Sequence, residues 1–357
     1  MMNTVCATWM MFFYTMPNHA GKILVGMGIM GAITAGGKVI DALYDPTIGY
    51  WSDNTMTRWG RRRPFIVGGA PLFFISFILI FHPFFAAGST ELILSVIALN
   101  TVFWLAFTTV MGPYNALLPE VALSSQKRVF LSTLLAAMML LATGYQGMIF
   151  PLMFDKWGMG YFKAAATTGI IAFCLIMITV LVIKERIPSA GEKLAKSHEK
   201  HSFKEAFKWT FANKPFRIYI IASVFQYLGF SSIMAALPYI VKVLMNKPES
   251  FVSVVFAFVI PVFAISFVAV NFIAKKTGKV KLYKGCLLLL ALLLPLLFFV
   301  GDPRIPISPV VAGIMLMNLL GFPLAGNMIL PTAILADIID YDEKITGRRR
   351  EAIYFGM

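Results

Sequence analysis

The sequence has few charged residues for its length. Of its 357 residues, 13% are Asp, Glu, Lys or Arg, whereas a typical soluble domain has about 25%. The apolar fraction is 59%, against about 45–50% in soluble domains. Most of the chain must therefore contact lipid or other protein segments rather than water. This composition disfavours a soluble globular enzyme.

Residues that commonly build cofactor and metal sites are also scarce. The chain contains three cysteines and four histidines. Cys6, Cys174 and Cys286 fall in apolar runs without metal-ligand spacing, which predicts buried free thiols. The histidines fall in loops or linkers, and the sequence contains no nucleotide-binding glycine loop. We therefore expect no cofactor and no enzymatic activity.

Long apolar runs recur at short intervals along the chain. A helix needs roughly 20 apolar residues to span a bilayer. Runs of this kind predict spans at 23–51, 64–87, 91–118, 129–154, 162–183, 216–245, 250–274, 282–300 and 305–341. Residues 1–16 look like the second half of a further span, and another begins near 351–357. The sequence thus predicts an all-α integral membrane protein with nine full and two partial transmembrane helices, truncated at both ends.

Acidic residues are the scarcer charge, and the positions of the basic ones are informative. With 31 Lys and Arg against 17 Asp and Glu, the net charge is +14. The basic residues gather in every second connection between the predicted spans. This positive-inside bias places those connections and the end of the chain in the cytoplasm of a multi-pass protein of the cell (inner) membrane. The excess charge therefore reports topology, and nucleic-acid binding is not expected.

The longest polar stretch, residues 184–215, separates an N-terminal helical bundle (1–183) from a C-terminal one (216–357). Within it, Phe203 and Phe207 recur at helical spacing, with lysines on another face. That pattern is typical of a helix lying on an anionic lipid surface, and a solvated linker explains it equally well. A basic linker between two bundles is the organisation of two-halved secondary transporters.

Two carboxylates lie inside the first full span, in the segment "KVIDALYDP". On a helix, Asp41 and Asp45 are one turn apart on the same face, near Lys38. An aspartate in mid-membrane costs roughly 2.5–3.5 kcal/mol, so a pair requires a bound cation or a proton. Such a pair can form half of a sodium, lithium or proton site, completed by hydroxyls or carbonyls from other helices. A structural pair between Lys38 and an aspartate is the alternative.

The residues after this pair form a second pattern, in which Gly49, Asp53, Arg58 and Gly60 precede three arginines. This order resembles the cytoplasmic signature of the major facilitator superfamily. The segments "IDALYDPTIGYWSDNTMTRWGRRRPF" and "LADIIDYDEKITGRRREAIY" resemble one branch, the glycoside–pentoside–hexuronide:cation symporter family typified by the melibiose carrier. "GPYNALLPE" is similar to the helix-four segment of that family. The resemblance implies the two-bundle major facilitator fold.

The resemblance also implies a cation site. The cation-binding aspartates of the family correspond to Asp41 and Asp45 in this sequence. The helix-four hydroxyl of the family corresponds to Thr108 or Thr109. This half of the coupled site is retained.

The sugar-binding half is altered. Met111 replaces an aspartate, and Asn115 and Met328 replace two tryptophans that contact sugar in the family. An aspartate and an indole are the usual grip on a sugar, so their loss argues against a melibiose-like substrate. Methionines facing the cavity would favour a more apolar or irregular solute.

Two sets of candidate residues follow from these patterns. The solute cavity is predicted to be lined by Lys38, Met111, Tyr114, Asn115, Gln226, Tyr227 and Met328. The cytoplasmic gate is predicted to comprise Gly49, Asp53, Arg58, Gly60, Arg61, Arg62, Arg63, Asp337 and Asp340. Polar residues in membrane helices also serve simply as hydrogen-bonding links between helices, so the cavity set carries that second interpretation.

The combined prediction is a secondary active transporter. It would couple sodium, lithium or a proton to symport of a small organic solute, with a sugar or glycoside as the candidate class, by alternating access. Its partners would be the solute, the cation and membrane lipid, with no obligate protein partner. An intramembrane aspartyl protease is disfavoured because its aspartates must meet from different helices, whereas Asp41 and Asp45 lie along one. A truncated, non-transporting fragment or a transporter-like membrane receptor is the alternative.

Overall fold

The computed structural model describes residues 1–17, 21–55, 57, 59–121, 134, 138–182, 211–302, 304 and 306–346. Within these ranges the secondary-structure elements are all helices, joined by short connections. The one pairing of extended backbone there is an isolated bridge between Thr57 and Gly60. The predicted all-helical class is confirmed. Arg58, residues 184–210 of the predicted linker and the expected span at 351–357 lie outside the described residues.

The chain folds into two compact units. The first contains a short N-terminal helical segment made of α1 (Met2–Val5), the π-helix η1 (Cys6–Met10) and α2 (Met11–Thr15). It also contains α3 (Met27–Asn54), α4 (Arg63–Ile80), α5 (Thr90–Val121), the π-helices η2 (Tyr145–Ile149) and η3 (Leu152–Lys156), and α7 (Gly160–Val182). The second unit contains α10 (Lys214–Tyr239), η4 (Ile240–Leu244), most of α11 (Phe251–Thr277), α12 (Lys279–Leu293), η5 (Leu294–Phe299) and α13 (Pro309–Thr346).

Seven helical segments of the described chain are long and apolar enough to cross a membrane. They are Arg63–Ile80, Thr90–Asn115, Gly160–Val182, Lys214–Leu244, Phe251–Thr277, Lys279–Phe299 and Pro309–Ile345. The helix α3 is as long as a span, but it carries Lys38, Asp41 and Asp45 and is not one of the seven. The number of spans expected from the sequence stays a prediction.

Two predicted span boundaries are wrong. The span expected at 64–87 ends as a helix at Ile80, because the chain turns through Phe81 and His82 and Pro83 cannot donate a helical hydrogen bond. The span expected at 305–341 begins at Pro309, where proline is favourable as a first helical residue, and extends to Thr346. The errors at 81–87 and 305–308 arise because apolar residues continue beyond the proline at which the helix ends or begins. The extension to Thr346 has the opposite cause, because the helix continues through polar residues after the apolar run has ended.

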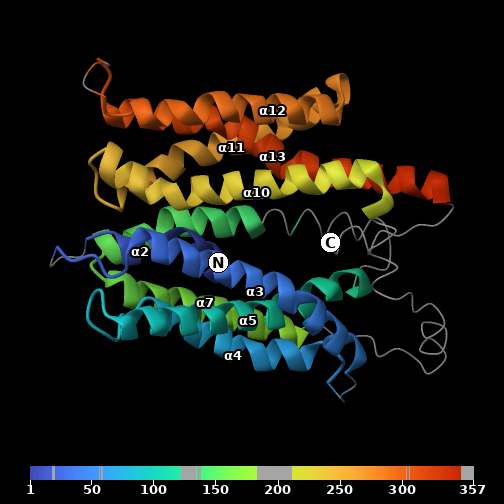
Figure 1. Cartoon of the computed structure of the whole chain (residues 1–357), viewed down its shortest axis with the longest axis horizontal. Helices are drawn as coiled ribbons and strands as arrows, with labels where there is room; N and C mark the ends of the chain where they lie inside the picture. Colours follow the sequence, from blue (N-terminus) through green and yellow to red (C-terminus); the bar gives the residue numbers. More distant parts are fainter. Residues whose placement is uncertain are drawn as a thin grey trace. The chain divides into compact units, whose positions relative to one another are not determined.

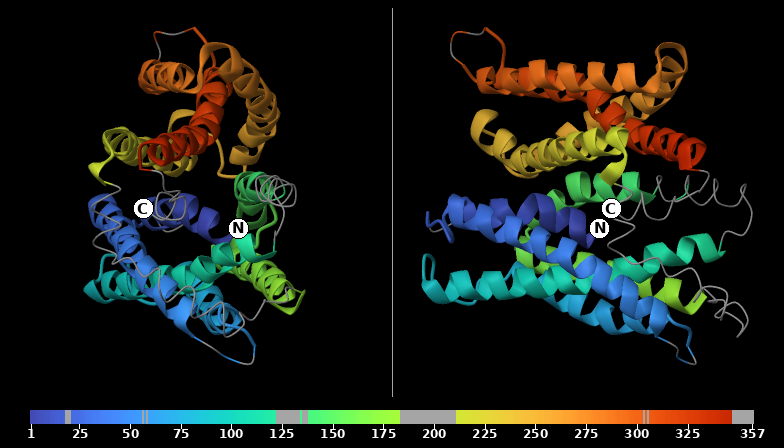
Figure 2. Two further views of the ribbon diagram at one scale, coloured as in Figure 1. Left: turned by 90° about the vertical axis from the view of Figure 1, so that its right-hand side faces the viewer. Right: turned by 45° about the vertical axis from the view of Figure 1, so that its right-hand side comes forward.

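Within the first unit, α4 packs against both α5 and α7, and α5 also packs against α3 (Figures 1 and 2). The helices α3 and α5 approach closely at Gly37, where a β-carbon would overlap the side chains of Trp104 and Asn100. Asn100 is buried there and donates its Nδ2–H to the carbonyl of Ile33 at 2.9 Å. Small residues and amide side chains are common means of holding membrane helices together.

Within the second unit, α12 packs along α13, and α13 also contacts α10 (Figure 2). Cys286 of α12 sits against Gly326 of α13, where an added β-carbon would lie 2.5 Å from the Cys286 sulfur. Buried apolar side chains around this contact, among them Val270, Leu330 and Ile334, form the core of the unit. The glycine therefore sets the distance between the two helices.

The cysteine prediction is correct for two residues and wrong for the third. Cys6 and Cys286 are buried free thiols, whereas Cys174 is a free thiol exposed on α7. An exposed apolar side chain is compatible with a helix face that meets lipid, so the apolar run did not imply burial inside the protein.

Gly326→Ala is expected to destabilise the protein by about 1–3 kcal/mol, because the new methyl group must displace the Cys286 sulfur in a close-packed core. The measurement is thermal unfolding of the purified protein in detergent. Gly285→Ala is the matched control, since nothing lies within 4 Å of a β-carbon there. Cys286→Ala should restore part of the lost stability, and equal losses with and without it would refute the contact.

Candidate functional site

The first candidate site lies where α3 crosses α5. The hydroxyl of Thr108 on α5 donates to Oδ1 of Asp41 on α3 at 2.5 Å. On the other side of the carboxylate, Lys38 Nζ lies 3.9 Å from Oδ2. The same ammonium group lies 3.6 Å from the centre of the Trp104 ring. Asp41 thus has a hydroxyl and a cation as immediate partners, and its side chain is only 17% exposed.

Helix geometry selects one of the two candidate hydroxyls. Thr108 is buried, and its hydroxyl lies 3.0 Å from the carbonyl of Trp104 in its own helix as well as reaching Asp41 on α3. The hydroxyl of Thr109 donates only to its own helix, to the carbonyl of Leu105 at 2.7 Å. Asp45 lies one turn beyond Asp41 on α3 and is exposed. Its carboxylate is repelled by Asp41 and attracted by Lys38. The structure therefore groups Lys38, Asp41 and Thr108 closely and places Asp45 at the edge of the group.

Carboxylate and hydroxyl oxygens are the ligands that hard cations prefer. Among the described residues, no three His, Cys, Asp or Glu side chains lie close enough together to hold a metal ion. The arrangement around Asp41 instead offers anionic oxygen to a single small cation, and Lys38 is a built-in counter-charge for the same carboxylate. Both interpretations of the sequence, a cation site and a structural pair with Lys38, are chemically compatible with this geometry.

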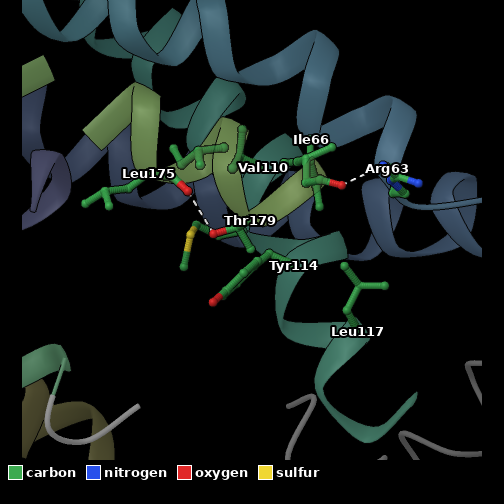
Figure 3. Close-up of a pocket in the computed structure, with 10 residues that line it drawn as sticks. Arg63, Ile66, Val110, Tyr114, Leu117, Leu175 and Thr179 are labelled. Carbon is green, nitrogen blue, oxygen red and sulfur yellow. Dashed lines mark hydrogen bonds between the residues drawn. The ribbon is translucent and has the colours of Figure 1, made fainter. Parts of the chain in front are cut away.

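Two predicted cavity residues line a cavity of about 200 Å³ between α4, α5 and α7 (Figure 3). Met111 and Tyr114 of α5 form part of its wall, together with apolar side chains of all three helices such as Ile66 and Leu175. The Thr179 hydroxyl is also at the wall but donates to the carbonyl of Leu175 at 2.8 Å. The cavity is therefore mainly apolar.

The other predicted cavity residues occupy different places. Asn115 is exposed on α5 of the first unit. In the second unit, Tyr227 on α10 and Met328 on α13 are exposed, at 54% and 40%. Gln226 on α10 donates its Nε2–H to the backbone carbonyl of Asn327 on α13 at 2.7 Å. This contact gives Gln226 a structural partner that sequence reasoning did not identify.

The arginine segment of the predicted gate begins at a tight turn. Thr57 and Gly60 exchange backbone hydrogen bonds of 3.2 and 3.1 Å, and Gly60 has a φ of 106°, a conformation that favours glycine. Arg62 is buried, and Arg63 at the start of α4 donates to the carbonyl of Val180 at 2.6 Å. Val180 is the third residue from the end of the described part of α7. Arg63 therefore links the start of α4 to α7 as well as lining the cavity.

The remaining gate candidates are divided between the units. Asp337 of α13 pairs with Lys279 at the start of α12, with Oδ1 and Nζ 2.6 Å apart. Asp340 is exposed on the same helix. In the first unit, the carbonyl of Gly49 in α3 accepts a hydrogen bond from the Ser52 hydroxyl at 3.1 Å. Asp53 belongs to α3, but its side chain and Arg58 lie outside what the structure describes. Gating by these residues stays a prediction.

Sequence reasoning missed Trp104 as a neighbour of the site. Trp104 precedes Thr108 by one helical turn, so the two share a face of α5, and this spacing was a usable signal. Asn100 is one turn earlier on that face. What the spacing could not show is that Gly37, next to Lys38, lets this face approach α3.

Replacing Thr108 by valine removes the hydroxyl that faces Asp41 while keeping the shape of the side chain. We expect Thr108→Val to destabilise the protein by about 1–2 kcal/mol, because a largely buried carboxylate loses a hydrogen bond. Thr109→Val is the control, since its hydroxyl bonds only to its own helix. Thermal unfolding of both variants checks this, and equal losses would contradict the assignment.

Comparison with known proteins agrees with this architecture. The family model described as MFS/sugar transport protein matches residues 1–357. The isoprimeverose transporter of Lactiplantibacillus pentosus is 25% identical over 98% of this chain and 71% of its own length. The inner membrane symporter YicJ of Escherichia coli is 24% identical over 97% of the chain and 72% of its own length. The putative glycoside/cation symporter YagG of the same organism is 26% identical over 92% of the chain and 70% of its own length.

The family match covers every element described above, and these relatives are transporters rather than enzymes. The resemblance first seen in the aspartate and arginine segments is thereby confirmed. The chain is an integral, multi-pass membrane protein that belongs to the MFS/sugar transport protein family.

Proposed function

We propose that the protein carries out cation-coupled symport of a sugar or glycoside by alternating access. The family match and the relatives named as symporters support this activity. The observation that carries the coupling is the contact of Thr108 with Asp41, which turns a carboxylate and a hydroxyl from two helices toward one point. Asp45, one turn away, would contribute the second negative charge.

Lys38 gives this site two electrostatic states. Without a bound cation, its ammonium group neutralises Asp41 and rests on the Trp104 ring. A sodium ion, lithium ion or proton at Asp41 and Asp45 would replace that neutralisation and release Lys38 from the carboxylate. The Lys38 side chain is partly exposed and its ammonium group is 3.9 Å from the carboxylate, so this pair is weak enough to be displaced in this way. Cation binding would thus change the contact between α3 and α5.

The cavity beside Met111 supports a solute with an apolar part. Its wall is mainly aliphatic, and its polar groups include the Arg63 guanidinium and the Tyr114 hydroxyl. A glycoside that carries an alkyl or aryl group could place that group here. The altered sugar positions at Met111 and Met328 are consistent with such a substrate.

The orientation of the protein is part of the same proposal. The basic connections and the C-terminal end would face the cytoplasm of a cell (inner) membrane, because positively charged loops are retained on that side. Solute, coupling cation and membrane lipid would be its partners, and the coupling ion would take the place of any cofactor.

Sodium and lithium, compared with choline, should raise the thermal stability of the detergent-purified protein. At about 100 times its dissociation constant, a cation should stabilise the protein by about 2.7 kcal/mol. Asp41→Asn and Asp45→Asn should abolish this increase, whereas Asp302→Asn, in a connection of the second unit, should retain it. If pH, rather than either ion, shifts the stability of the unmutated protein, the coupling ion is a proton. A well-folded protein that responds to neither refutes the coupled site.

An aryl or alkyl glycoside should stabilise the protein more than the corresponding free sugar, because only the glycoside can fill the apolar cavity. Met111→Trp, which fills the cavity with a side chain, should remove the difference. The same thermal assay measures both ligands at equal concentration. Equal responses to the glycoside and the sugar would exclude an apolar substrate group from this cavity.

A further inference from the structure

The helix α13 has an interior proline, Pro331, and this creates a specific problem. In an α-helix the carbonyl of residue 327 would accept the N–H of residue 331, but proline has none. The residue at that position, Asn327, is only 2% exposed, so water has little access to it. A buried carbonyl without a donor is unfavourable, and more so in a membrane than in a soluble protein.

A side chain from another helix supplies the missing donor. Gln226 of α10 places Nε2 2.7 Å from the carbonyl oxygen of Asn327. Next to this position, Gly326 packs against Cys286 of α12. The segment of α13 at 326–327 is thus held by a hydrogen bond from one helix and by close packing from another.

The first unit contains the same arrangement at a different proline. In the π-helix η2, the N–H of Phe150 bonds to the carbonyl of Tyr145, and Pro151 has no N–H to offer. The carbonyl of Gln146 is therefore left without a helical donor, and Trp9 donates its indole N–H to it at 3.0 Å. In the first unit the N-terminal helical segment donates the N–H that Pro151 lacks, through Trp9. In the second unit α10 donates the N–H that Pro331 lacks, through Gln226.

We propose that Gln226 is a positioning residue whose side-chain N–H replaces the backbone N–H missing at Pro331, and that it thereby fixes the part of α13 carrying Met328. Met328 directly follows Asn327 and is 40% exposed. This inference rests on the proposed function in so far as Met328 faces the solute. It gives Gln226 a role different from the direct solute contact expected from the sequence.

A double-mutant cycle tests the replacement. Gln226→Met keeps the length of the side chain but removes the donor, and Pro331→Ala restores the backbone N–H. Gln226→Met alone should lower the midpoint of thermal unfolding by roughly 2–6 °C. In the Pro331→Ala background it should cost less than half as much, because the restored backbone N–H then donates to the Asn327 carbonyl.

Asn271→Met is the control for loss of an amide, because Asn271 is exposed and donates only to the carbonyl of Phe267 in its own helix. It should leave the midpoint nearly unchanged in both backgrounds. An equal cost of Gln226→Met with and without Pro331 would overturn the proposal.

Two further measurements separate positioning from general stability. Hydrogen exchange of α13 amides at 328–335 should accelerate in Gln226→Met, and this readout does not require Pro331→Ala to fold. In solute uptake, Gln226→Met should raise KM more than it lowers the maximal rate, and Pro331→Ala should restore KM. Unchanged exchange, or an unrestored KM, would contradict the positioning role. The unfolding cycle and the exchange measurement need no transport, so they remain decisive if the proposed function fails.

Discussion

The need to neutralise a carboxylate among apolar helices governs the arrangement of the first unit. Asp41 meets the Thr108 hydroxyl on one side and the Lys38 ammonium on the other. An unneutralised carboxylate this far buried among apolar helices would cost several kcal/mol. The Thr108 hydroxyl is in reach because Gly37 lets α5 lie close to α3, whereas Lys38 lies on the same helix as Asp41. Charge compensation and helix packing therefore depend on each other here.

The same constraint applies to backbone carbonyls. In water, a carbonyl freed by proline would be hydrated, and a neighbouring donor would make little difference. In a membrane helix it must find a donor within the protein. Trp9 and Gln226 serve this purpose for the carbonyls of Gln146 and Asn327. Helices that bend at prolines are thus stable where another helix contributes a side-chain N–H, which ties local flexibility to tertiary contacts.

Several site features could be predicted because they depend on spacing along one helix. Asp41 and Asp45 share a face of α3 by simple periodicity. The choice between Thr108 and Thr109 could not be predicted in this way. Adjacent residues on a helix point in directions about 100° apart, and only the position of α3 decides which of them meets Asp41.

Other features depend on helices that the local pattern does not connect. Arg63 looked like a gate residue, but its guanidinium also donates a hydrogen bond to the carbonyl of Val180 on α7. Gln226 looked like a solute contact, and its amide instead donates to a carbonyl of α13. The end of the span at 64–87 and the start of the span at 305–341 were misplaced, because the apolar run continues beyond the proline that bounds the helix.

The sequence by itself determined the membrane class, most of the helices, the family and the carboxylate pair, because apolar length, charge bias and helical spacing are local properties. Only the tertiary structure decided which hydroxyl meets Asp41, which face of α5 approaches α3 and which donor reaches Asn327. These depend on the volumes of side chains at helix crossings, such as Gly37 against Trp104 and Gly326 against Cys286. Periodicity fixes the face on which a residue lies, and packing fixes the partner that it finds there.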